Sequence, residues 1–315
     1  MNETAAAYQS DQEAQRIFDT LRALPPGRVY AGLRSNWGES LKIDQVPMYR
    51  VLTFEGLWTV SVPLPSIVLN SEFSFHFDDR NPAFYELYDV RYVVAPRGLA
   101  MPDFLSPLLS GQRHVLYSLP DASAAMFASS TVERGVEDKI EHFYANRAWL
   151  LGPDMPARSF IRWNYPAAPA ATTPPTITRC ADGTISGEML EAARIRFDTS
   201  CGSASTVVIK TTFHPNWRVT VDGVEQPTFM VSPSYIGVDV PGGTHRIEAT
   251  YRSSMLRTVL LFAGIGAFAM VIVGRRVLAR RRATRTVATH GALSLAFEDA
   301  PSASDASLDS DQPRT

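Results

Sequence analysis

The sequence predicts an α+β protein with a small mixed α/β domain at residues 10–165, an antiparallel β-sandwich at 177–253 and one transmembrane helix at 254–274. Helical and strand patterns alternate in the first region, period-two patterns fill the second, and a long apolar run follows. The 315 residues suffice for two domains, and the 45% hydrophobic content is typical of globular proteins. A net charge of −2 gives no reason to expect a nucleic-acid partner.

The first region, after a disordered segment expected at residues 1–9, begins with a helix. Ser10 and Glu13 have the spacing of a capping box, and Pro25-Pro26-Gly27 ends the helix. Its apolar stripe consists of Ile17, Phe18, Leu21 and Leu24.

Further elements of both types follow in this region. Asn81-Pro82 is a cap and first-turn pair for a short helix, and a later helix is marked by Val136, Ile140 and Phe143. The predicted strands are Arg91–Pro96, His114–Leu119 and Ser159–Trp163. Mixed elements of this kind indicate a small α/β or α+β unit.

Residues 166–176 contain four prolines and predict a stiff linker, after which the sequence becomes strongly β. Apolar and polar residues alternate at 217–222, 236–240 and 247–251, and Asp222-Gly223 is a hairpin turn signal. Short alternating strands joined by such turns predict an antiparallel β-sandwich.

The apolar run Met255–Val273 carries a single charge, Arg257, near its start. A helix of this length spans about 28 Å, close to the hydrocarbon thickness of a bilayer. The alternative is a buried core helix, but an arginine block follows directly, consisting of Arg275, Arg276, Arg280, Arg281, Arg282 and Arg285. This block favours the membrane and predicts that residues before about 254 lie outside, whereas 275–315, a basic segment with a disordered acidic tail, are cytoplasmic.

An outside domain requires export, yet the first fifteen residues have neither an apolar core nor a basic start typical of a signal peptide. Two explanations are open. The chain is the C-terminal portion of a longer multi-span protein, which we prefer, or an unusual route exports it.

The segments TTFHPNWRVTVDGVEQP and VDVPGGTHRIEATYRSS, followed by a membrane helix, resemble the C-terminal end of YfhO-like bacterial membrane proteins. The matching residues are Phe213, Pro215, Trp217, Val221, Asp222, Gly223, Pro241, Gly243 and His245. An upstream match covers Val90, Arg91, Tyr92, Val93 and Val94. Such proteins are multi-span relatives of GT-C-type glycosyltransferases that use polyprenyl-phosphate sugars.

This resemblance implies a non-catalytic extracytoplasmic module of a protein of cell-envelope glycan or lipid-linked sugar metabolism. The catalytic acidic residues of GT-C enzymes lie in the first outside loop after the first membrane helix. This sequence has no match to that loop, so no catalytic residue is carried over. The implied partners are the membrane, the remaining helices of a multi-span protein, and a glycan or lipid-linked sugar. A stand-alone membrane-anchored binding or structural protein of the bacterial envelope is the alternative.

Cys180 and Cys201 are the only cysteines. In an oxidising compartment outside the membrane, a disulfide between them is the favoured interpretation, with two buried free thiols as the alternative. Neither cysteine has a neighbouring histidine, so we expect no zinc site, and no sequence motif predicts another metal or a cofactor.

His214, Trp217 and Tyr235 are aromatic residues that could form a sugar platform. Trp217 alternates with Val219 and Val221, so we expect it to lie in the core. His214 and Tyr235 then remain as candidate glycan contacts.

Acidic residues offer one further possibility, an envelope enzyme that uses Glu72, Asp78 or Asp79. Adjacent residues of an extended chain point in opposite directions, so Asp78 and Asp79 would not share one proton. A loop and helix-cap role before Asn81-Pro82 is the preferred interpretation, and we expect no catalytic residue in this chain.

Overall fold

The computed structural model describes residues 10–60, 76–164, 177–252 and 259–278. The chain divides into two compact units, Met1–Arg252 and Ser253–Thr315, which are considered separately. The mixed α+β class predicted from the sequence is confirmed. The expected disordered N-terminus, proline-rich linker and cytoplasmic tail lie outside the described residues.

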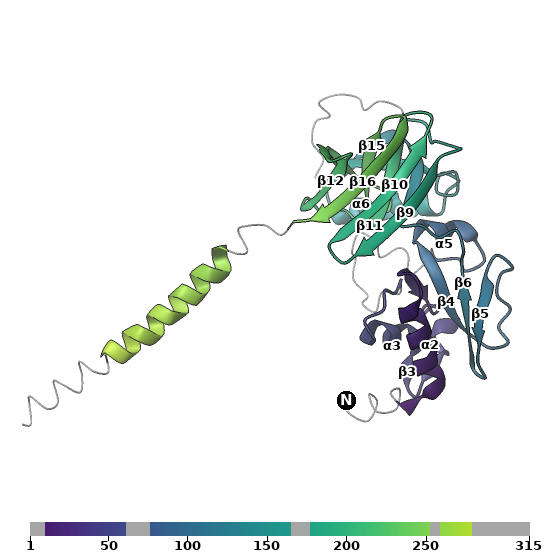
Figure 1. Cartoon of the computed structure of the whole chain (residues 1–315), viewed down its shortest axis with the longest axis horizontal. Coiled ribbons are helices and arrows are strands. Elements are labelled where there is room, and N and C mark those ends of the chain that lie inside the picture. The colour runs from purple at the N-terminus through teal and green to yellow at the C-terminus, as the bar shows by residue number, and fades with distance from the viewer. Residues whose placement is uncertain (1–9, 61–75, 165–176, 253–258, 279–315) are drawn as a thin grey trace, which may run out of the picture. The chain divides into compact units, whose positions relative to one another are not determined.

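The N-terminal half of the first unit is built on a four-stranded sheet in the order β1-β4-β6-β5 (Figure 1). β1 pairs with β4 in parallel, and the other pairs are antiparallel. Its strands are β1 (Arg28–Tyr30), β4 (Val90–Pro96), β5 (Ser106–Ser110) and β6 (His114–Ser118). The smaller elements are the 3₁₀ turn η1 (Trp37–Glu39), β2 (Lys42–Ile43), β3 (Val46–Pro47), α3 (Met48–Phe54) and α5 (Pro82–Leu87).

Helix α2 (Gln12–Ala23) packs its apolar stripe against this sheet. Ile17, Phe18 and Leu21 are buried with Val94 and Leu116 of the sheet, as the period-3.6 pattern predicted. The stripe therefore attaches the helix to the sheet, and polar residues cover its other side.

The start of α2 differs from the expected capping box. Asp11, and not Ser10, is the N-cap and accepts a hydrogen bond from the Ala14 amide. The Glu13 carboxylate instead accepts hydrogen bonds from the backbone amides of Arg113 and His114. A tertiary contact has therefore replaced the local reciprocal bond.

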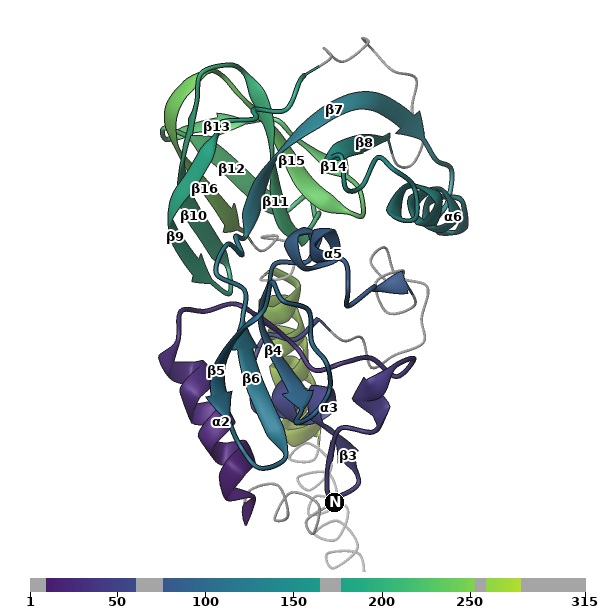
Figure 2. The same ribbon diagram turned by 90° about the vertical axis from the view of Figure 1, so that its right-hand side faces the viewer.

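The C-terminal half contains a closed five-stranded sheet in the order β11-β15-β14-β8-β7, seen in the upper part of Figure 2. Its strands are β7 (Ala125–Gly135), β8 (Ser159–Asn164), β11 (Ser205–Thr212), β14 (Thr228–Val231) and β15 (Tyr235–Val240). β7 and β8 are parallel, and helix α6 (Lys139–Leu150) makes the connection between them.

The expected domain boundary at residue 165 therefore runs through this closed sheet. β7 and β8 precede the boundary, yet they pair with β11 and β14, which follow it. Inside the sheet, Arg162 of β8 donates hydrogen bonds of 2.7 and 2.6 Å to the two carboxylate oxygens of Asp239 on β15. Local patterns identified the strands but not their partners, because pairing depends on residues far apart in the chain.

A second, fully antiparallel sheet has the order β13-β12-β16-β10-β9. Its strands are β9 (Thr184–Glu191), β10 (Arg194–Cys201), β12 (Trp217–Val221), β13 (Val224–Gln226) and β16 (Gly243–Tyr251). Phe197, Val219 and Ile247 of this sheet share one core with Val207 and Ile236 of the closed sheet. The two sheets thus bury each other's apolar faces.

The described residues of the second unit form the helix Val259–Leu278, whose apolar stretch has a mean hydropathy of 1.8 and is not buried within the structure. By length and composition this helix could cross a membrane. The expected start at residues 254–258 lies outside the described residues, and at its other end the helix runs beyond 274 to include Arg275 and Arg276. The other arginines of the block, Arg280, Arg281, Arg282 and Arg285, lie outside the described residues.

Candidate functional site

The junction between the two halves of the first unit contains a buried lysine, Lys210 on β11. Its ammonium donates a 2.7 Å hydrogen bond to the Ser123 carbonyl. Arg28 of β1 reaches across the junction, donating to the Tyr88 carbonyl at 2.8 Å and also to the Lys210 carbonyl. The N-terminal sheet is therefore joined to the closed sheet by charged donors on backbone carbonyls.

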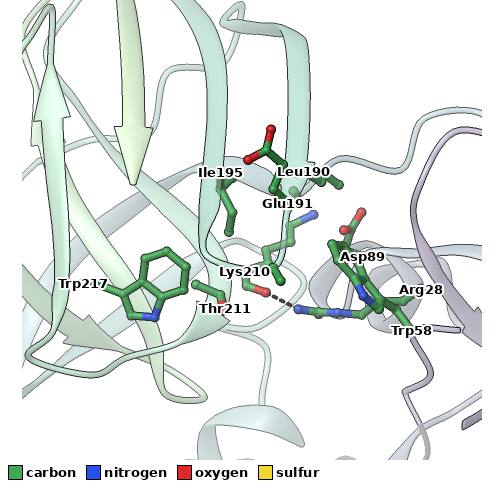
Figure 3. Close-up of a pocket in the computed structure, with 11 residues that line it drawn as sticks. Arg28, Trp58, Asp89, Leu190, Glu191, Ile195, Lys210, Thr211 and Trp217 are labelled. Atoms are coloured by element: carbon green, nitrogen blue, oxygen red, sulfur yellow. Dashed lines mark hydrogen bonds between the residues drawn. The ribbon is translucent and has the colours of Figure 1, made fainter. Parts of the chain in front are cut away.

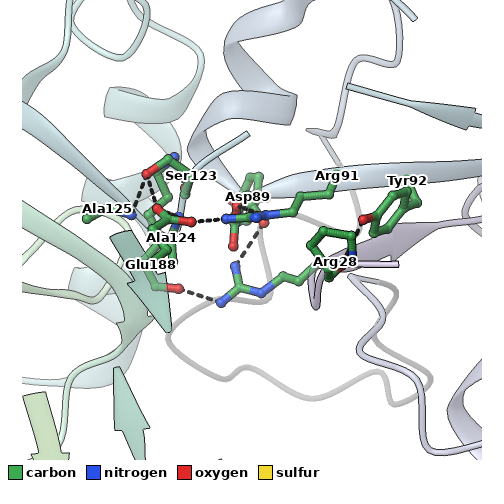
Figure 4. A network of polar contacts seen from close by, with 11 residues as sticks. Arg28, Asp89, Arg91, Tyr92, Ser123, Ala124, Ala125 and Glu188 are labelled. Atoms are coloured by element: carbon green, nitrogen blue, oxygen red, sulfur yellow. Dashed lines mark hydrogen bonds and ion pairs between the residues drawn. The ribbon is translucent and has the colours of Figure 1, made fainter. Parts of the chain in front are cut away.

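Glu188 of β9 is the centre of a second set of contacts at this junction (Figure 4). Its carboxylate accepts hydrogen bonds from Arg91, from the Ser123 hydroxyl and, at 2.9 Å, from the Ala124 amide. Arg91 also lies 3.5 Å from Asp89. Burial lowers the pKa of Arg91, but Asp89 and Glu188 outweigh this effect and raise it, so the guanidinium remains charged.

A cavity of about 300 Å³ adjoins this network (Figure 3). Its polar lining includes Arg28, Asp89, Glu191 and Lys210, and indole rings are contributed by Trp58 and Trp217. Burial lowers the pKa of Lys210 to about 8, although nearby Asp89 and Glu86 oppose that shift. Cations and carboxylates line the same cavity, so it offers donors and acceptors together and suits a small polar molecule.

The motif residues Asp222, Gly223 and His245 form a turn and its support. Asp222 and Gly223 have positive φ values of 53° and 83°, which the hairpin between β12 and β13 requires. Asp222 accepts a 2.8 Å hydrogen bond from the Arg246 amide and pairs at 2.7 Å with His245 Nδ1. The bond to Asp222 raises the pKa of His245, so this pair attaches the hairpin to β16.

The candidate sugar contacts His214 and Tyr235 do not share a surface. His214 is exposed, and its ring centre lies 5.5 Å from that of Tyr251. Tyr235 is only 2% exposed and packs near Tyr88 in the core. Trp217 is buried in the core between the two sheets.

The acidic candidates occupy loop positions among the described residues. Asp79 accepts a 2.7 Å hydrogen bond from the Trp37 indole, and Asp78 accepts one of 3.0 Å from the Arg80 amide. Asn81 caps α5 through the Ala83 amide. Glu72 lies outside the described residues.

Cys180 and Cys201 form a disulfide, with their Cα atoms 6.2 Å apart. In the described part of the chain, no group of three or more His, Cys, Asp or Glu side chains is arranged to hold a metal ion.

The sequence analysis missed Arg28, Asp89 and Lys210. One weak signal was available, because Lys210 directly follows the apolar run at residues 207–209, and the structure buries all residues from 205 to 210. Arg28 and Asp89 give no such signal, since a charged residue at the end of a strand or helix is ordinary.

Comparisons of this chain with protein-family models, curated proteins and solved structures found no match. The fold and site together define an α+β body with a polar junction cavity, in a chain that also carries one long apolar helix.

Proposed function

We propose that this chain is a non-catalytic, extracytoplasmic module of a YfhO-like, glycosyltransferase-related bacterial membrane protein. In this role it positions an acceptor glycan or lipid-linked sugar, or contacts a partner, outside the membrane. The Val259–Leu278 helix anchors it with the arginine-rich tail in the cytoplasm, and the two packed sheets constitute the β-sandwich of the family.

The observation that carries this proposal is the position of the apolar helix. Strand β16 ends at Tyr251, and the helix begins at Val259, so a short segment separates the folded body from a candidate span. Arginines both end the helix and follow it, in agreement with a cytoplasmic C-terminal side. The Cys180–Cys201 disulfide supports an oxidising compartment for the body.

The alternative, a stand-alone membrane-anchored binding protein of the envelope, is favoured by the junction cavity. Buried charged groups cost stability unless they are paired, and their presence around a cavity is typical of binding sites. In this alternative the cavity itself is the functional site.

Reporter fusions test the anchor and its direction. The fusions are made in the chromosomal gene, so that any preceding segments are kept. Alkaline phosphatase folds only after export, so fusion after Thr250 should give activity and fusion after Arg285 should give none. The reverse pattern would overturn the orientation, and activity at neither site would overturn export of the body.

The apparent mass of the natural product separates the two functions. An epitope tag on the chromosomal gene should reveal a protein far larger than the 34.7 kDa of this chain if it belongs to a multi-span protein. A tagged product of about this size would favour the stand-alone alternative.

A further inference from the structure

Helix α6 has an unusual distribution of side chains. Its inner face buries the polar residues His142 and Asn146 together with Ala145, Trp149 and Leu150. Its outer face carries Ile140, Tyr144, Arg147 and Ala148 at the spacing of one helical stripe, which the C-cap residue Leu151 continues. The exposed Lys139 and Glu141 lie beside this stripe. The three large apolar side chains in this stripe are more than half exposed, at 54%, 61% and 57% for Ile140, Tyr144 and Leu151.

The polar residues on the inner face of α6 are energetically unfavourable there, because several of their atoms are buried without hydrogen bonds. Among the described residues, no hydrogen-bond partner is found for either ring nitrogen of His142 or for the side-chain oxygen of Asn146. The same holds for Trp163 Nε1 and Ser232 Oγ. Burial lowers the pKa of His142 to about 4, so the imidazole is neutral. The inner face therefore combines unpartnered polar groups with buried Trp149 and Leu150, while Ile140, Tyr144 and Leu151 remain outside.

Helix α2 shows that the same chain builds ordinary amphipathic helices. It buries Ile17, Phe18 and Leu21, and residues such as Asp19 and Arg22 face outward. The exposed apolar stripe of α6 is therefore a local property, and it indicates a surface that something else covers.

The cluster beneath α6 is connected, through Phe213 and the neighbouring Asn216, to Arg252, the last described residue of the body. Phe213 packs against the cluster beneath α6, which includes Ala145 and Trp163, and also against the core between the two sheets. Three residues along, the Asn216 carbonyl accepts a 2.9 Å hydrogen bond from the Arg252 amide. From Arg252 to Val259 the chain can extend at most about 25 Å.

We propose that the outer face of α6 docks on the headgroup region of the bilayer in which the chain is anchored. This inference rests on the proposed membrane anchor. Tyrosine prefers the membrane interface, Ile140 and Leu151 can enter the acyl boundary, and Arg147 can pair with lipid phosphate.

A lipid surface fits this stripe better than a protein partner. A stable protein interface requires about 1,000 Å² or more of buried surface, and one three-turn helix face provides much less. A tethered body meets the membrane at high effective concentration, so a weak contact suffices.

The test uses the full chain in vesicles of phosphatidylcholine and phosphatidylglycerol. Three variants each receive one fluorescent bimane label: Tyr144→Cys on α6, Ser110→Cys on the exposed strand β5 as a control, and Phe268→Cys in the apolar helix. Lipids with a nitroxide at the headgroup or along the acyl chain quench a label that they contact.

We expect the label at position 144 to be quenched several-fold more than the label at position 110, mainly by the headgroup nitroxide. Ile140→Asp should reduce the quenching at position 144, whereas Glu133→Gln, an exposed change on β7 and outside α6, should not. Quenching at 268 together with equal, weak quenching at 144 and 110 would overturn the docking and leave the anchor intact. A label at 144 that is shielded from water but not quenched would show a protein occupant and also overturn it. Absence of quenching at 268 would remove the anchor, and the docking with it.

Discussion

Replacement of Lys210 by methionine should remove a contribution to stability that rises between neutral and alkaline pH. Lysine ordinarily has a pKa of 10.5, and burial lowers that of Lys210 to about 8. At about 1.4 kcal/mol per pKa unit, this difference means that the protonated amine destabilises the native state by about 3 kcal/mol.

The sign follows from proton binding. Below about pH 8 both the native and the unfolded chain hold the proton, and the native chain bears the full cost. Between about pH 8 and 10.5 the native amine releases its proton first, so the unfolded state binds more protons and the free energy of unfolding rises with pH. Methionine has a similar length and no charge, so Lys210→Met should lose this rise.

The assay is urea unfolding of residues 1–252, a compact unit, followed by tryptophan fluorescence at about pH 7.5 and about pH 10. Each variant is compared with itself at the two pH values, so the constant effect of losing the bond to Ser123 cancels. Lys42→Met, at an exposed lysine, is the matched control and should keep the rise. Parallel pH profiles for the wild type and Lys210→Met would refute a desolvated ammonium at the junction.

Two further predictions concern the core between the sheets. Thiol labelling of the unreduced, denatured protein should find both Cys180 and Cys201 unreactive, and full labelling without reductant would contradict the disulfide. Replacing both cysteines by serine should lower the free energy of unfolding by about 3 kcal/mol for a loop of this length. Trp217→Ala should cost about 3–5 kcal/mol, the usual penalty for a buried large aromatic, and an unchanged melting temperature with lost glycan binding would instead place the indole on a functional surface.

The sequence predicted those elements whose side chains follow a local rule. The apolar stripe of α2, the Asn81-Pro82 start of α5 and the Asp222-Gly223 turn all depend on residues within one or two turns of each other. For α6, the same pattern reasoning found the helix but not its orientation. Ile140 was part of the expected apolar stripe, yet it faces outward and His142 faces inward.

The junction could not be predicted from local patterns. Arg28 contacts the carbonyl of Lys210, and Arg91 contacts Glu188, across separations of 182 and 97 residues. Charged residues on strands are compatible with exposed positions, and only the packing of the two halves turns these residues into partly buried partners.

The closed sheet has a consequence for chain connectivity. Its neighbouring strands β7 and β11, and β8 and β14, come from opposite sides of residues 165–176. A protease that cuts between residues 165 and 176 would therefore release nothing, because the two fragments stay joined by strand pairing and by the Arg162–Asp239 ion pair. The same interlocking means that a ribosome must complete β15 before the sheet can close. β7 can pair early with β8, but its other edge waits for β11, which begins at Ser205, about 70 residues after the end of β7 at Gly135. Fragments expressed separately from either side of the cut should accordingly complement each other, as the halves of a split protein do.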